Sequence, residues 1–198
     1  MSTINPLKWL YKKGRQQQKS QSYDDARKRF RQILDRTREA DWVERANAGL
    51  AEVYLAEGNL FWAMDHVRRA IKRNPRSGQY RFLKGKIHYQ RQEWRQAADE
   101  AIKAVETDSK SGRFYHLLAR SLEQKGDDRE ARRYYEWALR YQPKNLDIRF
   151  DLVAYEIKQG SFQTALQCLK QGLEIHDDSD RLRKKIRAIQ ENWKITGS

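Results

Sequence analysis

The sequence predicts an all-α protein built from repeated pairs of helices. Three observations predict this fold class: alanines recur at intervals of 34 residues, apolar residues within each interval follow a helical period, and a turn with glycine or a capping residue divides each interval. The chain has 198 residues, which suits one domain or two small ones. It is rich in charge but retains 11% aromatic residues, so it carries the bulky apolar side chains that a folded core needs.

Four positions keep the 34-residue spacing through four consecutive units. Two of them are small residues in the second half of each unit: Ala63, Ala97, Ala131 and Ala165, and then Ala70, Ala104, Ala138 and Gly172. The other two are a position in the first half and the turn: Ala51, Gly85, Ala119 and Val153, and then Gly58, Gln92, Gly126 and Gly160. One register held at four positions predicts a solenoid of stacked repeats.

Within a unit the apolar period is helical. In the unit around Gly126 one face carries these residues: Tyr115, Leu118, Ala119 and Leu122 before the turn, and Ala131, Tyr135, Ala138 and Leu139 after it. Gly126 ends the first helix, and the aspartate that follows it caps the second. Each unit is therefore predicted to be a helix, a tight turn and a second helix.

The small residues mark places where the helices of a repeat cross closely. A side chain larger than that of Ala131 would push the two helices apart, and such overpacking costs about 1–3 kcal/mol. We therefore expect Ala131→Arg to lower the melting temperature more than the replacement of its neighbour, Arg132→Ala.

These residues resemble the tetratricopeptide repeat family, whose 34-residue pattern combines Leu-Gly, Tyr, Ala, an aromatic residue, Ala and Pro. One unit matches this pattern through Tyr115, Leu118, Ala119, Ala131, Tyr135, Ala138 and Pro143. Two units depart from it, one with His88 where the family has tyrosine and one with Glu156 and Gly172. The resemblance covers nearly the whole chain and implies a right-handed α-solenoid.

The predicted organisation is a single solenoid over residues 1–198. It begins with a divergent repeat, continues with four regular repeats and ends with a capping helix, over residues 7–43, 44–77, 78–111, 112–145, 146–179 and 180–194. The divergent repeat has about three residues inserted at its end, around Ala40–Trp42. The capping helix is apolar at Leu182, Ile186, Ile189 and Trp193, which is typical of the polar-backed helices that close stacked repeats.

The formal net charge of +14 favours acidic partners such as nucleic acid, an anionic membrane or an acidic peptide. Residues 1–22 carry five basic side chains and no acidic one, and residues 180–198 carry six basic and two acidic ones. We interpret most charges of the central part as solvated helix faces. Cys168 is the only cysteine, and the chain shows no signal-peptide core or apolar stretch of membrane-spanning length, so we expect a soluble cytoplasmic protein.

The sequence shows no set of residues typical of catalysis, a cofactor or a metal site. The histidines His66, His88, His116 and His176 lie in different repeat halves, and none has a second ligand at metal-binding spacing. The turn glycines do not form a phosphate-binding loop. We therefore expect a protein that is not an enzyme and has no cofactor, and we interpret His88 and Cys168 as packing residues.

The resemblance implies a concave groove, lined by the first helices of successive repeats, that binds an extended peptide or a partner's helix. The groove-facing positions that mix aromatic and cationic side chains are Phe82, Lys86, Tyr89, Arg113, His116, Arg120 and Phe150. Aromatic side chains beside cations suit an acidic, partly apolar segment. The alternative is that the aromatics pack between repeats and the cations only keep the surface soluble. Some members of the family clamp acidic chaperone tails with specific lysines and asparagines, and those residues are absent here.

The leading hypothesis is thus a non-catalytic scaffold or adaptor that binds a protein partner. Two alternatives stay open: nucleic-acid binding through the basic surface, and association of the N-terminal segment NPLKWLYKKGR with an anionic membrane. The favoured interpretation of that segment is the first helix of the first repeat. Formation of a homo-oligomer also stays open, because apolar faces at the ends of a solenoid often pair.

Overall fold

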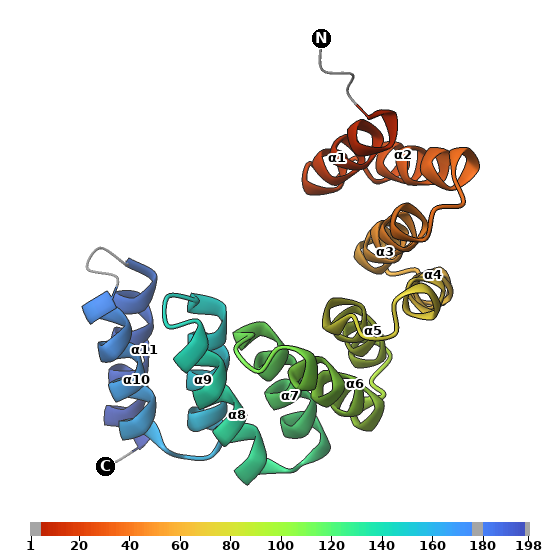
Figure 1. Ribbon diagram of the computed structural model, residues 1–198. Coiled ribbons are helices and arrows are strands. Elements are labelled where there is room, and N and C mark those ends of the chain that lie inside the picture. The colour runs from red at the N-terminus through yellow and green to blue at the C-terminus, as the bar shows by residue number, and fades with distance from the viewer. Residues whose placement is uncertain (1–4, 176–179, 197–198) are drawn as a thin grey trace. The chain divides into compact units, whose positions relative to one another are not determined.

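The computed structural model describes residues 5–175 and 180–196, and for residues 192–196 the backbone alone. Within these ranges the chain forms eleven α-helices and no strand (Figure 1). The prediction of an all-α fold made of helix pairs is therefore confirmed. The chain divides into two compact units, Met1–Asp108 and Ser109–Ser198, which we call the N-terminal unit and the C-terminal unit.

The N-terminal unit contains three helix pairs. Its helices are α1 (Pro6–Lys19), α2 (Tyr23–Arg36), α3 (Ala40–Ala56), α4 (Leu60–Arg73), α5 (Gly78–Gln90) and α6 (Trp94–Thr107). Each odd-numbered helix packs on the even-numbered helix that follows it, and successive odd-numbered helices touch. The odd-numbered helices lie on one side of this unit and the even-numbered helices on the other (Figure 1). Residues 40–42, which we expected as an insertion, form the first turn of α3.

The C-terminal unit contains two helix pairs and a last helix. Its helices are α7 (Gly112–Lys125), α8 (Asp128–Tyr141), α9 (Leu146–Lys158), α10 (Phe162–Ile175) and α11 (Asp180–Thr196). Helix α11 packs on α10 and buries Leu182 and Ile189, two of its predicted apolar residues. The side chain of Trp193 and residues 176–179 lie outside the described residues. The limits of the individual repeats stay a prediction.

The small residues lie where the helices of a pair cross. Ala131 and Ala138 have no accessible surface, and neither have Ala97 and Ala104 at the equivalent places, which agrees with the close packing expected there. The need for a small side chain at Ala131 stays a prediction. Gly172 differs for a local reason. A Cβ atom on it would lie 2.7 Å from the Cδ of Arg149, so this repeat has no room even for alanine.

The turns between paired helices share one backbone conformation. Gly58, Gly126 and Gly160 have φ values of 76°, 90° and 74°, which glycine adopts without strain. Gln92 occupies the same turn in another pair, and Gln21 occupies it in the first pair, both at φ 60°. This left-handed conformation costs a residue with a side chain about 1–2 kcal/mol. The turn geometry therefore belongs to the repeat, and two turns of the N-terminal unit adopt it with an unfavourable residue.

Two positions that are 19 residues apart meet inside four successive helix pairs, one on the odd-numbered and one on the even-numbered helix. We call them the paired positions. They are Asn47 with His66 (Oδ1 to Nδ1, 2.9 Å), Arg81 with Glu100 (Nη1 to Oε2, 3.4 Å), Tyr115 with Tyr134 (stacked rings, 6.1 Å) and Arg149 with Cys168 (Nη1 to carbonyl oxygen, 2.7 Å). One place in the fold thus carries four different interactions.

Candidate protein-binding surface

A small pocket opens on the side of the N-terminal unit formed by α1, α3 and α5. Its volume is about 250 Å³, and its lining residues are Gln18, Glu52, Leu55, Ala56, Gln79, Phe82, Leu83, Lys86 and Gln90. Phe82 and Lys86 lie one turn apart on α5, and the Lys86 Nζ is 5.9 Å from the centroid of the Phe82 ring. The structure therefore brings two of the predicted groove residues together beside a cavity.

The charges around this pocket are not balanced. Glu52 forms an ion pair with Arg15 and accepts a hydrogen bond from the side-chain amide of Gln18 at 2.9 Å, so its charge is compensated within the chain. Lys86 is exposed, and no carboxylate of the described residues lies within ion-pair distance of it. The pocket therefore presents one uncompensated positive charge next to an aromatic ring.

Tyr89 lies apart from this pocket. Its ring packs edge-on against Trp94 of α6, with the centroids 5.0 Å apart and the planes at 63°. The resemblance to the repeat family placed Tyr89 among the groove-facing positions. In the structure its ring forms part of the contact between the two helices of the pair.

In the C-terminal unit, His116 and Arg120 share one carboxylate. Both come from α7, and Asp151 of α9 accepts a hydrogen bond from His116 Nε2 at 2.8 Å and lies 3.5 Å from Arg120 Nε. Burial alone would raise the pKa of Asp151, but the hydrogen bond and charge of His116 and the charge of Arg120 lower the pKa below its ordinary value. These two predicted groove cations thus have an acidic partner inside the chain.

The two remaining predicted residues also have partners within the C-terminal unit. The guanidinium of Arg181 on α11 covers the ring of Phe150, with Cζ 5.1 Å from the centroid. The guanidinium of Arg113 lies over Phe114, with Cζ 5.4 Å from the centroid. Phe150 and Arg113 thus each take part in a contact between an aromatic ring and a guanidinium group within this unit.

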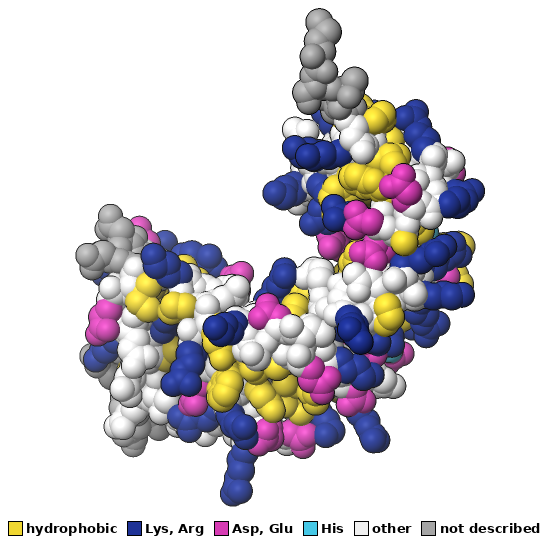
Figure 2. Space-filling view, viewed as in Figure 1, with side chains coloured by type: hydrophobic (Ala, Val, Ile, Leu, Met, Phe, Trp, Pro, Cys, Tyr) yellow, Lys and Arg dark blue, Asp and Glu magenta, His cyan; other side chains and the backbone are white. Residues whose placement is uncertain are grey.

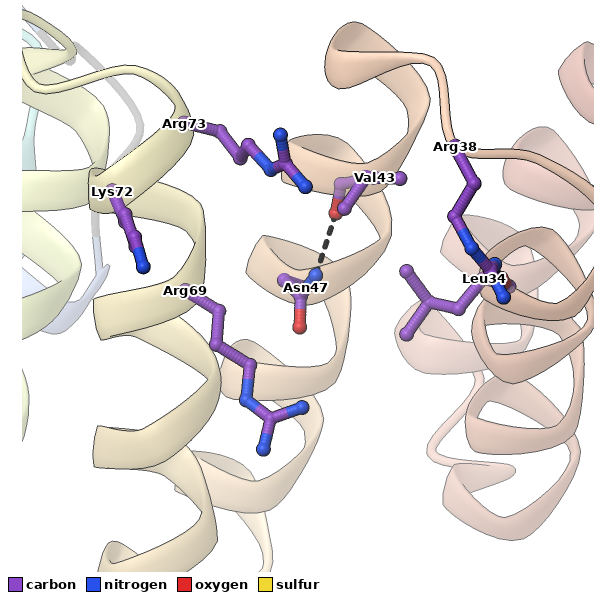
Figure 3. Close-up of a pocket in the computed structure, with 7 residues that line it drawn as sticks. All are labelled: Leu34, Arg38, Val43, Asn47, Arg69, Lys72 and Arg73. Carbon is purple, nitrogen blue, oxygen red and sulfur yellow. Dashed lines mark hydrogen bonds between the residues drawn. The ribbon is translucent and has the colours of Figure 1, made fainter.

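A larger pocket that the sequence did not reveal lies between α2, α3 and α4. Its volume is about 510 Å³, and Figure 3 shows its lining residues, which are Leu34, Arg38, Val43, Asn47, Arg69, Lys72 and Arg73. Lys and Arg side chains gather over α4 in Figure 2. The signal in the sequence is the group of basic residues between Arg68 and Arg76, which belongs to the central charges interpreted above as solvated helix faces.

The N-terminal segment forms α1 and packs as the first helix of the first pair. Leu10 and Gly14 are buried, and Tyr11 packs against Phe30 of α2 at 5.9 Å between ring centroids. Trp9 remains 48% exposed, with the guanidinium of Arg29 over its ring. Most of the apolar residues that suggested membrane association therefore take part in packing. Within the described residues, no helix combines the length and the apolar character that crossing a membrane requires.

The other candidate chemical groups have packing roles. His88 is mostly buried, and its Nδ1 contacts the carboxylate of Glu93. Cys168 is buried, and burial raises the pKa of its thiol although Arg149 acts in the opposite direction. Across residues 5–175 and 180–191, no three His, Cys, Asp or Glu side chains gather closely enough to hold a metal ion. His176 lies outside the described residues.

The comparisons with known proteins agree with this architecture. Residues 63–112 and 122–189, together more than half of the chain, match family models described as tetratricopeptide repeat, a repeat whose general role is protein interaction. No curated protein matches the chain.

Solved structures share the fold at low identity. A thermophilic tetratricopeptide repeat protein of Thermus thermophilus has 17% identity and a TM-score of 0.76, covering 93% of this chain and 98% of its own. MamA of Desulfovibrio magneticus RS-1 has 13% identity and a TM-score of 0.72, covering 90% and 99%. The helical solenoid, the repeat spacing and the two family matches lead to one assignment: the chain belongs to the tetratricopeptide repeat family.

Proposed function

We propose that this protein is a non-catalytic adaptor that binds an acidic, partly apolar segment of a protein partner on the surface formed by α1, α3 and α5. The observation that carries the proposal is the pocket beside Phe82 and Lys86. Membership of a family of interaction scaffolds supports the class of function.

The size and lining of the pocket favour a side chain of a peptide over a free small molecule. Pockets for small molecules usually have volumes of about 300–1,000 Å³, and this one has about 250 Å³. Phe82 and the buried Leu83 offer apolar contact, while Lys86 can pair with a carboxylate of the same segment. An aromatic side chain in a partly closed pocket is typical of the few residues that dominate an interface.

The N-terminal unit is the better anchor because its cation is available. A ligand carboxylate that approached His116 or Arg120 would have to displace Asp151 from an existing contact. Lys86 requires no such exchange. In the proposal, Phe82 and Lys86 therefore bind the ligand directly, and Arg113, His116, Arg120 and Phe150 contribute less.

A pull-down from lysate tests the proposal. The purified chain is used with and without nuclease and at two salt concentrations, and the retained proteins are identified. The double variant Phe82→Ala, Lys86→Glu is compared with the matched control Ile102→Ala, Arg95→Glu, which removes one exposed apolar side chain and reverses one charge on α6.

A defined protein that survives nuclease and moderate salt, is retained by the control and is lost from the Phe82 and Lys86 variant would support the proposal. Equal retention by both variants would contradict the proposed surface. Retention that disappears with nuclease would assign the binding to nucleic acid, whose phosphate contacts weaken steeply with salt.

A further inference from the structure

The pocket between α2, α3 and α4 lies apart from the surface proposed above. It is formed by the end of α2, the beginning of α3 and the last two turns of α4. Figure 3 shows Arg69, Lys72 and Arg73 extending from α4 on one side, with Leu34 and Arg38 on the other and Asn47 between them. Its volume of about 510 Å³ is twice that of the pocket beside Phe82, and it is large enough for a ligand side chain and its flanking groups.

The charge of this pocket is positive and partly uncompensated. None of its lining residues is acidic. Arg69 has a partner on its own helix, Asp65, at 2.9 Å, and Arg38 donates hydrogen bonds to backbone carbonyl oxygens. In the described part of the chain, no carboxylate lies within ion-pair distance of Lys72 or Arg73. Two cations next to each other on α4 are therefore available to meet an anion.

The interior of the pocket offers both apolar and polar contact. Leu34 and Val43 supply aliphatic surface. The side-chain nitrogen of Asn47 donates one hydrogen bond, to the carbonyl oxygen of Val43 at 2.8 Å, and its oxygen lies 2.9 Å from His66 Nδ1. An amide nitrogen carries two hydrogens. The second one has no acceptor among the described residues, so a ligand carbonyl can use it.

The lining discriminates between classes of anionic ligand. Proteins that bind single-stranded nucleic acid combine cations with aromatic side chains on which bases stack. This pocket has cations but no aromatic lining residue. Its aliphatic walls suit leucine, isoleucine or valine, and its cationic edge suits carboxylates on either side of such a residue.

We propose that the pocket between α2, α3 and α4 binds an acidic peptide segment in which an aliphatic side chain enters the cavity and the flanking carboxylates pair with Lys72 and Arg73. The inference goes beyond the function proposed above, because it concerns a different surface and different residues. The two pockets share no lining residue, so in this proposal the N-terminal unit can bind two segments.

The test measures fluorescence anisotropy of a fluorescein-labelled peptide made of repeated Glu-Glu-Leu units, with the full-length chain. All measurements use the background Phe82→Ala, Lys86→Glu, so that binding at the other surface does not contribute. In this background the additional change Lys72→Glu, Arg73→Glu is compared with the control change Lys184→Glu, Lys185→Glu. The control reverses two adjacent exposed lysines on α11 and gives the same net charge.

We expect the Lys72 and Arg73 reversal to weaken binding at least about tenfold, and the control to change it by less than about twofold. A peptide of Glu-Glu-Ser units should bind about tenfold more weakly than the leucine peptide, since it cannot fill the cavity. Melting followed by circular dichroism checks that each variant is folded, and Lys72→Gln, Arg73→Gln replaces the reversal if that variant unfolds.

Four results would overturn the inference: no binding of the leucine peptide in this background, equal weakening by the control, equal binding of the serine peptide, and preferential binding of labelled oligouridylate. A failure of the leucine peptide to bind would leave the proposed function untouched. That function is tested by the pull-down, which changes only Phe82 and Lys86, whereas the peptide test is carried out with both residues already replaced.

Discussion

The pairs α5–α6 and α9–α10 carry an arginine at the same paired position and satisfy it in different ways. Arg81 and Arg149 each donate from Nη2 to the carbonyl oxygen of the proline that precedes their helix, at 3.4 and 3.1 Å. Beyond that, Arg81 meets the carboxylate of Glu100, whereas Arg149 donates to the carbonyl oxygen of Cys168. The same site thus accepts an ion pair or a backbone contact, and each solution sets its own demands on the neighbouring residues.

In the pair α5–α6, three cationic side chains surround the carboxylate of Glu100. Glu100 is only 4% exposed and lies 2.8 Å from Lys84 Nζ and 3.4 Å from the nearest side-chain nitrogens of Arg81 and Lys103. Burial would raise the pKa of Glu100, but the hydrogen bond from Lys84 and the three cations lower it below its ordinary value.

In the pair α9–α10, a buried carboxylate has fewer cationic neighbours, and its pKa shifts in the opposite direction. Glu156 of α9 is 2% exposed and has one arginine partner, Arg132, at 2.9 Å. Burial raises the pKa of Glu156 above its ordinary value, Glu136 adds to that rise, and Arg132 does not outweigh them. The number of nearby cations therefore decides in which direction the pKa of each of these two buried carboxylates is shifted.

The largest effect should follow from neutralising Glu100. We expect Glu100→Gln to lower the free energy of unfolding by about 2–3 kcal/mol, because Lys84 and Arg81 lose the partner that compensates their partial burial. Urea unfolding measures this change. The exposed neighbour provides a control, since Asp99→Asn should change stability by less than about 0.5 kcal/mol. If the two variants were equally stable, the cation cluster would contribute nothing.

The pH dependence should differ in sign between the two glutamates. The pKa of Glu100 is lowered on folding, so its stabilisation is present above its ordinary pKa of 4.5 and is lost as the pH falls through its folded value. The pKa of Glu156 is raised on folding, so its ionisation destabilises the fold at neutral pH and acidification relieves that cost.

Acidification from neutral pH towards pH 4 should therefore shrink the stability advantage of the unmodified chain over Glu100→Gln. Over the same range it should raise the stability of the unmodified chain relative to Glu156→Gln. Thermal melts across the pH series measure both differences. Two differences that change in the same direction would show that the two carboxylates do not differ as described.

The position of Arg149, which donates to the carbonyl oxygen of Cys168, leaves no room for a side chain at Gly172. Gly172→Ala should therefore destabilise the chain by about 1–2 kcal/mol through overpacking. Helix propensity alone predicts the opposite, a gain of about 1 kcal/mol. The added Cβ would meet Arg149 at 2.7 Å. In the background Arg149→Ala the same substitution should become neutral or stabilising, and a double-mutant cycle by urea unfolding measures this coupling. Additive effects would exclude the steric explanation.

Substitution of Arg132 should destabilise the chain more than its position on a polar helix face indicates. Because it pairs with the buried Glu156, we expect Arg132→Ala to cost about 1 kcal/mol, while Arg129→Ala on the same helix costs less than about 0.5 kcal/mol. Ala131→Arg should still lower the melting temperature more than Arg132→Ala, since Ala131 has no accessible surface. Equal melting temperatures for the Arg129 and Arg132 variants would contradict the role of the ion pair.

The smallest effect concerns the turns. Gln92→Gly should stabilise the N-terminal unit by about 0.5–1 kcal/mol, because glycine adopts the left-handed conformation without strain but has more freedom when unfolded. Gly126→Gln, the reciprocal change in the C-terminal unit, should destabilise by a similar amount. Differential scanning calorimetry compares the two. A loss of stability in Gln92→Gly would mean that the Gln92 side chain contributes contacts that outweigh its strain.

The repeat itself could be predicted from the sequence because it rests on local rules. Ala131 and Ala138 recur at a fixed interval, and Gly126 marks a turn whose geometry depends on one residue. The equivalence of Gln92 and Gly126 was visible from the spacing, and only the backbone shows that glutamine adopts the same left-handed turn.

The candidate site could be predicted only in part because its electrostatics depend on pairs between helices. His116 was correctly placed on a first helix, but its partner Asp151 is 35 residues away on the next first helix. The pocket between α2 and α4 was missed for the same reason. Leu34 and Arg73 belong to different helix pairs, and only the packing of those pairs brings them around one cavity.

The four paired positions also bear on how a chain of similar repeats assembles correctly. If the first helix with Arg81 packed on the second helix with His66, Arg81 would lose the carboxylate of Glu100. If the helix with Tyr115 packed on the one with Glu100, Glu100 would lose Arg81 and Lys84, and an uncompensated buried charge costs several kcal/mol. We therefore expect each of these first helices to pack more favourably on its own second helix than on another. Different chemistry at one repeated place should disfavour packing between helices of the wrong repeats, both within one chain and between copies.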